Sequence, residues 1–412
     1  MTPGALATAS LETGRSATPA PKAVMYAYPW DLYDHGVERA LDELEACGIY
    51  SVQLSFSYHL ATFLNPRNPR RKTRYGEPGV LEFDPGVLAA GAWPFEPPVA
   101  PEVSGVGYTS ELLSAMAARG FDVIAWVVYL YNHNVAKRRP ELSVENAFGD
   151  RHGAQLCPAN PAVRDYAAKL TNAVMQAPHL SGMVVESLSF LPFDYGFINL
   201  KSAVTPSAGV GRLLSLCFCD HCTALALEAE IDVPELRRRV VKVIEAELAE
   251  LPDGKLIGSG AEQWQQQSTA LNDYLTVRRH TATSLQREAL GKARDGGLRT
   301  GTNSAEGQDP RVSGVPNEAV ADLRDEFRFE LLPTMSAAQL GQAVQRARAA
   351  AGEGVELYAL AQLSNFQTEN SFRGSLETAA GLGIERFRLY EYGLLSERQL
   401  AWLRNSRDLW RT

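Results

Sequence analysis

Eight short runs of β-branched and aromatic residues recur along the 412-residue chain, separated by stretches with helical periodicity. The runs cover residues 23–29, 51–57, 122–132, 182–190, 298–304, 328–334, 355–363 and 386–393. Helical patterns over residues 36–48, 109–121, 161–176 and 371–384 each lead into one of the runs. Most of these patterns meet Gly or another small residue just before the run, as helix C-termini do. The alternation predicts eight βα repeats.

The runs are nearly continuously apolar, which is typical of parallel strands that are buried on both faces. Eight such repeats favour an α/β fold of the closed (β/α)8 TIM-barrel type, and an open doubly wound sheet is the alternative. The segment after the first run, YPWDLYDHG, has no G-x-G-x-x-G, and G-x-x-x-x-G-K-[ST] is absent from the chain. The missing phosphate loops argue for the barrel.

Two connections are too long for simple βα loops. Residues 57–106, after the second run, are rich in proline, and residues 188–230 follow the fourth run. In a barrel these β2–α2 and β4–α4 insertions lie over the C-terminal face, where active sites are built. The Ala, Thr, Ser and Pro of residues 1–22 predict a disordered leader, which leaves residues 23–412 as one barrel domain.

The charge pattern limits the partners. A formal net charge of −8 gives no general basic field, so a nucleic-acid partner is not expected. The basic stretch over residues 67–74 is short and contains prolines, which predicts a solvated loop. No apolar run is long enough for a membrane span and no secretory signal is recognisable, so we expect a cytoplasmic protein. The sequence leaves a homo-oligomer open.

Cysteine is rare but concentrated. Of five cysteines, Cys217, Cys219 and Cys222 form a C-x-C-x-x-C turn, and Cys157 lies upstream in AQLCPANPAVRDY. In a reducing compartment such a cluster indicates a metal site, and four thiolates around one tetrahedral ion are typical of structural zinc. We therefore predict that these four cysteines bind zinc. Cys47, at the end of a predicted helix, is expected to be a buried free thiol.

These segments resemble the zinc-containing β-galactosidases of glycoside hydrolase family 42. The matching features are LCPANPAVRDY, the following run with its glutamate, and CFCDHC. The resemblance implies four zinc cysteines and a general acid/base at Glu186, at the end of the fourth strand. It covers residues 23–230 at motif level and implies a glycosidase-like (β/α)8 enzyme with a structural zinc. Val185 stands where the family has asparagine, and Gln362 and Asn365 stand where its nucleophilic glutamate ends the seventh strand.

Glycoside hydrolysis usually needs two carboxyl groups, one as acid and one as base or nucleophile. Glu186 is the first choice, because its apolar strand should desolvate the carboxyl and suit it to donating a proton. Glu391, between two tyrosines at the end of the eighth run, is the second choice. Asp194 and Glu306, in the loops after the fourth and fifth runs, are further candidates. Glu330, in FRFELLPT, has little polar context.

Polar and aromatic residues follow other predicted strands and suit a neutral sugar, because amides and imidazoles pair with hydroxyls and rings cover a pyranose face. The candidates for substrate binding are Trp30, Asp31, Tyr58, His59, Asn132, His133, Asn134, Asn303, Gln362, Asn365 and Tyr392. The sequence thus predicts a glycosidase for a small glycoside or oligosaccharide. Two alternatives stay open: a metal-dependent sugar isomerase or lyase that uses His59, His133 and Glu186, and a non-catalytic carbohydrate-binding barrel.

Overall fold

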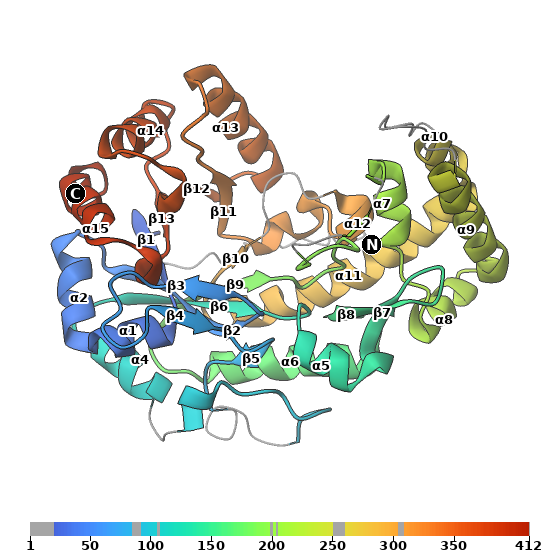
Figure 1. The fold of residues 1–412 in the computed structure, drawn as a ribbon, viewed down its shortest axis with the longest axis horizontal. Coiled ribbons are helices and arrows are strands. Elements are labelled where there is room, and N and C mark those ends of the chain that lie inside the picture. Colours follow the sequence, from blue (N-terminus) through green and yellow to red (C-terminus); the bar gives the residue numbers. More distant parts are fainter. Residues whose placement is uncertain are drawn as a thin grey trace, which may run out of the picture.

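Eight parallel strands form a closed barrel, because the first strand pairs with both the second and the last (Figure 1). The computed structural model describes residues 20–84, 92–104, 108–197, 201–202, 205–249, 260–303 and 309–411, and the count of strands refers to these ranges. The barrel strands are β1 (Ala23–Ala27), β2 (Ser51–Tyr58), β6 (Asp122–Val128), β9 (Leu180–Glu186), β10 (Arg299–Thr302), β11 (Glu326–Glu330), β12 (Glu356–Gln362) and β13 (Phe387–Tyr390). The predicted (β/α)8 barrel is confirmed, and each strand overlaps one predicted run. Most of the predicted leader lies outside the described residues.

The interior of the barrel is packed with side chains from different strands. One apolar cluster joins Val24, Ile124, Val184 and Tyr358. Elsewhere in the barrel, the buried Arg388 guanidinium donates to Gln53 and Glu326. A buried charge needs such partners, because an unpaired ion away from water is costly. The barrel is therefore filled, which leaves the strand ends as the place for a ligand site in this fold.

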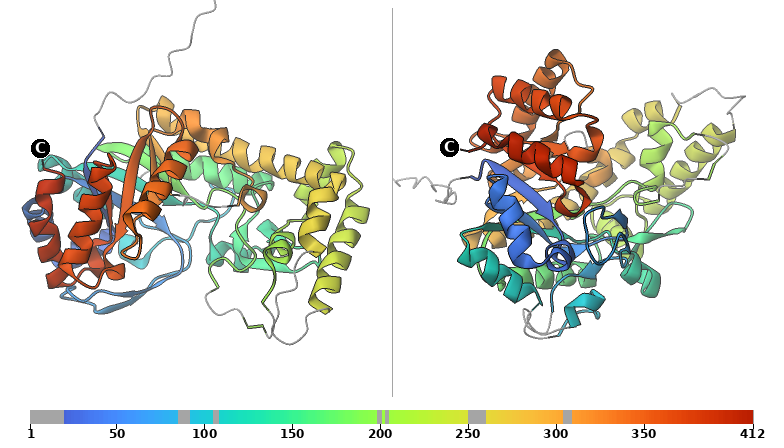
Figure 2. Two further views of the ribbon diagram at one scale, coloured as in Figure 1. Left: turned by 90° about the horizontal axis from the view of Figure 1, so that it is seen from above. Right: turned by 60° about the vertical axis from the view of Figure 1, so that its left-hand side comes forward.

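Helices surround the strands and bury their apolar faces against them (Figure 2). The helices of the outer ring are α1 (Pro29–His35), α2 (Val37–Ala46), α4 (Tyr108–Ala118), α6 (Pro161–Met175), α11 (Thr269–Asp295), α12 (Pro310–Ser313), η3 (Asn317–Leu323), α13 (Ala337–Ala351), α14 (Glu369–Gly381), α15 (Glu397–Asn405) and η6 (Arg407–Leu409). The four predicted helical stretches correspond to α2, α4, α6 and α14. Capping boxes that begin at Ser336, Thr368 and Ser396 fix the starts of α13, α14 and α15.

The predicted insertion after β2 contains three short strands. The strands β3 (Thr62–Leu64) and β4 (Thr73–Tyr75) form a hairpin, and β5 (Val80–Leu81) pairs antiparallel with the end of β2. A 3-10 turn, η1 (Pro101–Ser104), precedes α4. This insertion lies against α1, at the carboxyl end of β1.

The basic stretch over residues 67–74 is only partly the solvated loop that its composition predicts, because Arg70 and Lys72 are exposed but two other arginines are buried. Arg67 is buried, pairs with Glu43 at 2.6 Å and lies over the ring of Tyr392. Arg74 is also buried and pairs with Glu102. Acidic partners from other elements compensate the cost of burying these charges, and local composition does not reveal those partners. Arg67 therefore fastens the insertion to α2, whereas Arg74 joins two parts of the insertion to each other.

A hairpin that the sequence does not predict follows β6. After α5 (His133–Arg138) and η2 (Pro140–Leu142), the strands β7 (Ser143–Glu145) and β8 (Arg151–Leu156) pair antiparallel. The turn between them uses Asn146, whose Oδ1 accepts from the backbone of Phe148 and Asp150. The hairpin lies beside the helices that follow β9.

The insertion after β9 is longer than the predicted 188–230, because two further helices belong to it. It contains α7 (Ala208–Leu214), α8 (Asp220–Glu228), α9 (Val233–Ala249) and α10 (Gly260–Gln267). These helices and the start of α11 share an apolar cluster of their own, with members such as Leu213, Val240, Ile244 and Tyr274. The insertion forms a helical lobe at one side of the barrel (Figure 1). None of the helices in the described ranges is long and apolar enough to cross a membrane.

Candidate active site at the carboxyl ends of the strands

Glu186 ends β9, where neighbouring strands hold its carboxylate from both sides. Its Oε2 accepts a hydrogen bond from Trp126 Nε1, on β6, at 2.7 Å. Asn303, just after β10, donates to the same Oε2 through Nδ2. Tyr26 then donates to Asn303 Oδ1 at 2.8 Å, which fixes the orientation of the amide. Both donors bind the same oxygen of a partly exposed side chain. None of the described residues donates a hydrogen bond to the other oxygen, Oε1, which is therefore available to a ligand.

The backbone turns sharply immediately after this carboxylate. Ser187 adopts a φ of 53°, in the left-handed region that residues other than glycine rarely occupy. The Ser187 carbonyl accepts from Leu130 N at 3.1 Å, and the Glu186 carbonyl accepts from Tyr129 N at 3.0 Å. These bonds hold the turn in place. Strained backbone of this kind is common at functional sites.

Aromatic rings from four strand ends form a wall around Glu186. The ring of Trp126 lies edge-on to Tyr26 at 5.2 Å and to Tyr58 at 4.9 Å. Tyr390 contacts Tyr26 at 5.3 Å, and its hydroxyl lies 3.1 Å from that of Tyr28 and 3.4 Å from that of Tyr58. Burial raises the pKa of Tyr390 to about 12, so its hydroxyl keeps its proton at neutral pH. The wall therefore consists of apolar ring surfaces, and the Tyr390 hydroxyl within it is protonated.

His59 follows β2 and lies near enough to Glu186 for the charge of that carboxylate to act on its imidazole. Its ring stacks on Tyr58 at 4.1 Å, and Nδ1 lies 3.0 Å from the Leu60 carbonyl. Burial lowers the pKa of His59, and the nearby charge of Glu186 acts in the opposite direction. Because a carbonyl oxygen can only accept, Nδ1 carries the proton of the neutral imidazole, and Nε2 is left as a hydrogen-bond acceptor.

Glu391, which directly follows Tyr390, lies together with Asp31 as a buried carboxyl pair. Burial raises the pKa of Asp31 to about 7, and burial together with the Asp31 carboxyl raises that of Glu391 well above its usual value. The pair shares a proton at neutral pH, because two adjacent buried carboxylates cannot both be ionised at low cost. Asn65 Nδ2 donates to Asp31 at 2.9 Å, and Gly393 N donates to Glu391 at 2.7 Å. Both side chains are fully buried.

A third buried acid, which the sequence does not single out, lies close to this pair. Burial raises the pKa of Glu82 to about 8, while Arg74 opposes the shift. The Arg74 guanidinium lies 4.1 Å from the ring of Trp30, which in turn stacks on Tyr28 at 4.3 Å. Trp30 is therefore buried between an arginine and a tyrosine. The predicted role of Trp30 as a sugar platform would require these contacts to open.

The other candidate carboxyl groups differ in position. Asp194 is exposed in the loop after β9, near His152. Glu306 lies outside the described residues. Glu330, at the end of β11, has a side chain 39% exposed and pairs with Arg328 at 2.9 Å. Arg328 also donates to the Asn303 carbonyl at 2.8 Å, which links Glu330 to the residue that holds Glu186.

The remaining predicted sugar contacts divide into supporting and accessible residues. Asn132 is buried and caps α5, with Oδ1 on Val135 N and Nδ2 on the Gly79 carbonyl, so its polar atoms support the loops. Tyr392 is buried and donates to Glu43 at 2.8 Å, away from Glu186. His133, Asn134 and Gln362 are partly exposed at or after strand ends. Asn365 is exposed in the short turn η4 (Leu363–Asn365).

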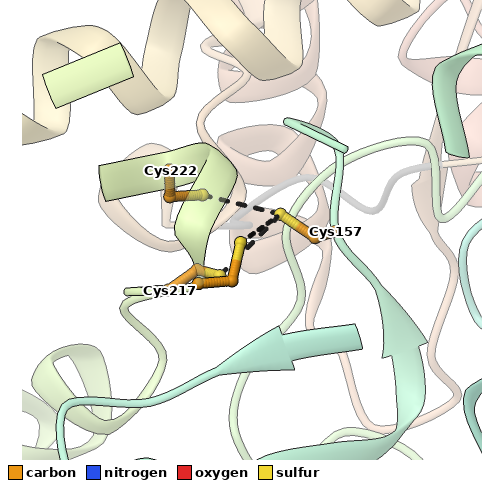
Figure 3. Close-up of side chains that lie close together, drawn as sticks. Cys157, Cys217 and Cys222 are labelled. Atoms are coloured by element: carbon orange, nitrogen blue, oxygen red, sulfur yellow. Dashed lines mark hydrogen bonds between the residues drawn. The ribbon is translucent and has the colours of Figure 1, made fainter. Parts of the chain in front are cut away.

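Four cysteines come together between the hairpin and the helical lobe (Figure 3). Cys157 follows β8, whereas Cys217, Cys219 and Cys222 lie at the start of α8. The Cys157 sulfur is 3.5 Å from those of Cys219 and Cys222 and 3.8 Å from that of Cys217. Four sulfurs bound to zinc at about 2.3 Å would lie about 3.8 Å apart, so the spacing fits a tetrahedral ion.

The cysteine cluster is the one grouping of metal-ligand type among the residues that the structure describes. His59, His133 and Glu186 do not form such a group there, which removes the geometric basis for the predicted isomerase or lyase metal site. Cys47 is buried apart from the cluster, with its sulfur 3.9 Å from the Leu400 carbonyl, and burial raises its pKa to about 11.

Sequence reasoning names Asn303 only as a candidate sugar contact, and it does not identify Trp126 or Tyr26, which complete the support of Glu186. Trp126 and Tyr26 lie inside predicted strands, where large aromatic residues are expected to pack in the core. Arg328 likewise lies within a predicted strand, and the sequence does not show that it contacts Glu330 and the Asn303 carbonyl. An aromatic residue on the strand beside the one that carries the candidate glutamate is the signal that was available, but it requires knowledge of strand order.

Comparison with known proteins shows the fold. No protein-family model matches the chain, and no curated protein matches it. A β-galactosidase from the psychrophilic Marinomonas ef1 superposes with a TM-score of 0.57 at 11% identity, over 94% of this chain and 59% of that one. α-L-Fucosidase isoenzyme 2 from Paenibacillus thiaminolyticus gives 0.55 at 11% identity, over 95% and 49%. The chain therefore spans about half to three fifths of the length of these two proteins.

A third similar structure has about the same length as this chain. The PgaB glycoside hydrolase domain from Bordetella bronchiseptica superposes with a TM-score of 0.55 at 12% identity, over 94% of this chain and 99% of that domain. At such low identity the likeness concerns the fold. The chain thus has the closed (β/α)8 barrel architecture that these glycoside hydrolases share.

Proposed function

We propose that the protein is a glycoside hydrolase in which Glu186 is the general acid or base. The observation that carries the proposal is the fixed, partly exposed carboxylate at the end of β9, held by Trp126 and Asn303 inside an aromatic wall. Oε1 can exchange a proton with a glycosidic oxygen while Oε2 stays bound. Such positioned proton transfer contributes about 10²–10⁴-fold to hydrolysis. Glycoside hydrolases with the same fold support this choice of reaction.

Glu330 is the best placed partner for Glu186. Glu391, the sequence-based second choice, is fully buried beside Asp31, so a substrate cannot touch it without rearrangement. Glu330 is accessible and lies two strands from Glu186, at a backbone spacing of roughly 10 Å from the strand separation in sheets. If the two carboxyl groups keep this separation, a water molecule fits between them, as an inverting mechanism requires. We propose that Glu330 activates that water.

We further propose that the four cysteines bind a structural zinc ion, as in the family 42 enzymes that the sequence resembles. All four positions of a tetrahedral ion would be filled by Cys157, Cys217, Cys219 and Cys222, with none left for a substrate. The ion would tie the hairpin segment to the helical lobe. It would stabilise the loops around the barrel mouth without taking part in the chemistry.

The proposal is tested by comparing Glu186→Gln with Glu330→Gln on neutral aryl glycosides and oligosaccharides. Glu186→Gln keeps the shape and the hydrogen bonds but removes proton transfer, so hydrolysis should fall by at least about 10²-fold. Glu330→Gln should cause a comparable loss if Glu330 activates water. Unchanged hydrolysis in Glu186→Gln would contradict the proposal, and sugar binding without hydrolysis by the wild type would indicate a carbohydrate-binding barrel instead.

A further inference from the structure

A separate cavity of about 270 Å³ lies between the β7–β8 hairpin and the segment that follows β9. Its lining includes His152 and Gln155 from β8, and Leu191, Phe193 and Phe197 from the other side. None of the residues to which we assign the reaction lines this cavity. It is therefore distinct from the environment of Glu186.

The cavity is nevertheless connected to the surroundings of Glu186 through Tyr131, which contacts residues of both. Tyr131 pairs with Gln155 through an isolated backbone bridge. The Tyr131 ring lies 4.7 Å from the ring of His59 and 5.0 Å from that of Tyr195. The charge of Glu186 acts on both His59 and Tyr195, so these side chains lie near its carboxylate. A chain molecule bound at Glu186 could therefore continue towards the cavity.

The polar groups of the cavity suit an uncharged ligand. Gln155 is 1% exposed, and neither its Nε2 nor its Oε1 has a hydrogen-bond partner. Burial lowers the pKa of His152, which favours the neutral imidazole. The charged side chains at the rim already have partners, because Arg151 pairs with Glu145 at 2.9 Å and Asp150 accepts from Asn146 at 3.1 Å.

The unpartnered amide is the strongest sign of a ligand. A buried amide without hydrogen bonds costs free energy of folding, and such groups normally have partners in folded proteins. One donor and one acceptor on the same side chain match a pair of sugar hydroxyl groups. An apolar side chain would fill the same space at lower cost if packing were its only role.

Aromatic rings supply the other half of a sugar-binding surface. Phe197 is 47% exposed, and its ring contacts His133 at 5.6 Å and His152 at 5.5 Å. An exposed ring beside buried polar groups is the usual arrangement for holding the apolar face and the hydroxyls of a pyranose. The volume lies just below the range of about 300–1,000 Å³ typical of pockets for drug-sized ligands, so it suits one ring.

We propose that this cavity is a subsite for one neutral sugar unit and that the substrate is an oligosaccharide extending from Glu186 past Tyr131. The inference rests on the proposed glycoside hydrolase function, and it deepens that function by naming the substrate class. Phe197 covers the sugar ring, and His152 and the Gln155 amide bind its hydroxyls, the amide after a side-chain rotation that brings it out of its buried position. A monosaccharide with a small leaving group would leave the subsite empty.

The test measures binding of neutral β-1,4-linked oligomers of glucose, xylose, mannose and galactose, from one to four units, by calorimetry. The protein carries Glu186→Gln, so that the oligomers stay intact. Affinity should rise at least about tenfold when the chain gains the unit that reaches the cavity. Phe197→Ala and Gln155→Met should each remove most of that gain and leave the affinity for the shortest binding oligomer unchanged.

The chain offers a matched control in Phe148→Ala. Phe148 is 42% exposed in the turn of the same hairpin but does not line the cavity. This variant should bind every oligomer as the Glu186→Gln protein does. Gln155→Met should also keep or raise Tm, because it removes a buried amide without partners. Loss of binding together with a lower Tm would assign Gln155 a structural role and overturn its part in the subsite.

The outcomes separate the two proposals. Binding and hydrolysis that do not depend on chain length, or an undiminished gain in both Phe197→Ala and Gln155→Met, would overturn the subsite while the glycosidase proposal stands. No binding of any oligomer and no hydrolysis by the wild type would contradict both. A length-dependent gain without hydrolysis by the wild type would support the subsite and overturn the proposed reaction.

Discussion

At the scale of single residues, the site depends on how a few carboxyl groups are surrounded. Glu186 is held by two N–H donors and stays partly exposed, whereas Glu391 is buried against Asp31. The sequence places both glutamates at strand ends in similar aromatic settings, and only their neighbours distinguish them. An accessible carboxylate can exchange protons with a substrate, but a buried pair that shares a proton can only support the structure around it.

Trp126→Phe should lower kcat/KM while the fold is kept. Phenylalanine preserves most of the ring packing but removes the Nε1–H that donates to Glu186 Oε2. A hydrogen bond to a charged group contributes about 1.5–3 kcal/mol, so we expect a loss of about tenfold to 100-fold if the bond positions the carboxylate during reaction. The matched control is Trp264→Phe in the helical lobe, which should retain full activity. Equal activity of the two variants would contradict the positioning role of Trp126.

Glu82→Gln should make the stability of the protein depend less on pH as the pH rises towards about 8. Burial raises the pKa of Glu82 to about 8 in the folded protein, whereas an unfolded glutamate titrates at about 4.3. The folded state therefore binds this proton more tightly, and the resulting stability is complete below about pH 4 and lost as the pH rises towards about 8. Tm of the wild type should fall more between about pH 6 and pH 9 than Tm of Glu82→Gln.

The exposed Glu77 gives the control for this measurement, because Glu77→Gln should leave the pH dependence of Tm as in the wild type. Arg74, Glu102 and Asp31 also act on the pKa of Glu82, so each is kept intact in the comparison. Identical pH profiles for the wild type and Glu82→Gln would refute the raised pKa.

At the scale of elements, strand ends and their first turns set the geometry of the site. The chain leaves β9 through Ser187, whose φ of 53° redirects the backbone as soon as Glu186 has been presented. Two backbone hydrogen bonds from the segment after β6 hold this turn. Loop insertions after β2, β6 and β9 then surround the carboxyl ends of the strands. The barrel supplies rigid positions, and the insertions supply the walls.

Ser187→Val should destabilise the protein, whereas Ser187→Gly should not. A left-handed backbone costs about 1–2 kcal/mol for a residue with a Cβ, and a β-branched side chain fits it least well. We expect the free energy of unfolding of Ser187→Val to drop by at least about 1 kcal/mol in urea titration. Glycine has no such cost and serves as the control. If both variants unfold at the same urea concentration as the wild type, the turn is not strained as described.

At the scale of the whole molecule, a closed barrel carries a helical lobe with its own apolar cluster. The four cysteines lie where the hairpin after β6 meets this lobe, so the proposed zinc joins two insertions that are distant in sequence. Cys157 and Cys217 are separated by 60 residues. A cross-link of this kind restricts both insertions at once and would steady the loops around the cavity beside Tyr131.

Elemental analysis of the purified protein should give about one zinc per chain. Cys219→Ser should reduce the zinc content to below about 0.2 per chain and lower Tm, because thiolates bind the metal only in the folded site. Cys47→Ser is the matched control, since it removes a buried free cysteine outside the cluster and should keep the metal. A protein that is fully folded and active with no bound metal would rule out the structural zinc.

Much of the fold follows from local patterns in the sequence. Each barrel strand overlaps a predicted run, because strands buried on both faces need continuous apolar residues. The cysteine cluster was equally predictable, since three cysteines in six positions have few roles other than a metal site. The hairpin after β6 and the full length of the lobe were not, because short polar strands and surface helices carry weak signals.

The candidate site shows more clearly what could not be predicted from the sequence. The sequence by itself determined the strands, the positions of carboxyl and aromatic residues at their ends, and the four cysteines, because these depend on periodicity and spacing along the chain. Only the tertiary structure decided that Trp126 and Asn303 hold Glu186. It also decided that Glu391 is buried beside Asp31, and that Arg67 and Arg74 are buried. These facts depend on contacts between residues far apart in the chain, which set burial and charge and leave no trace in the local pattern.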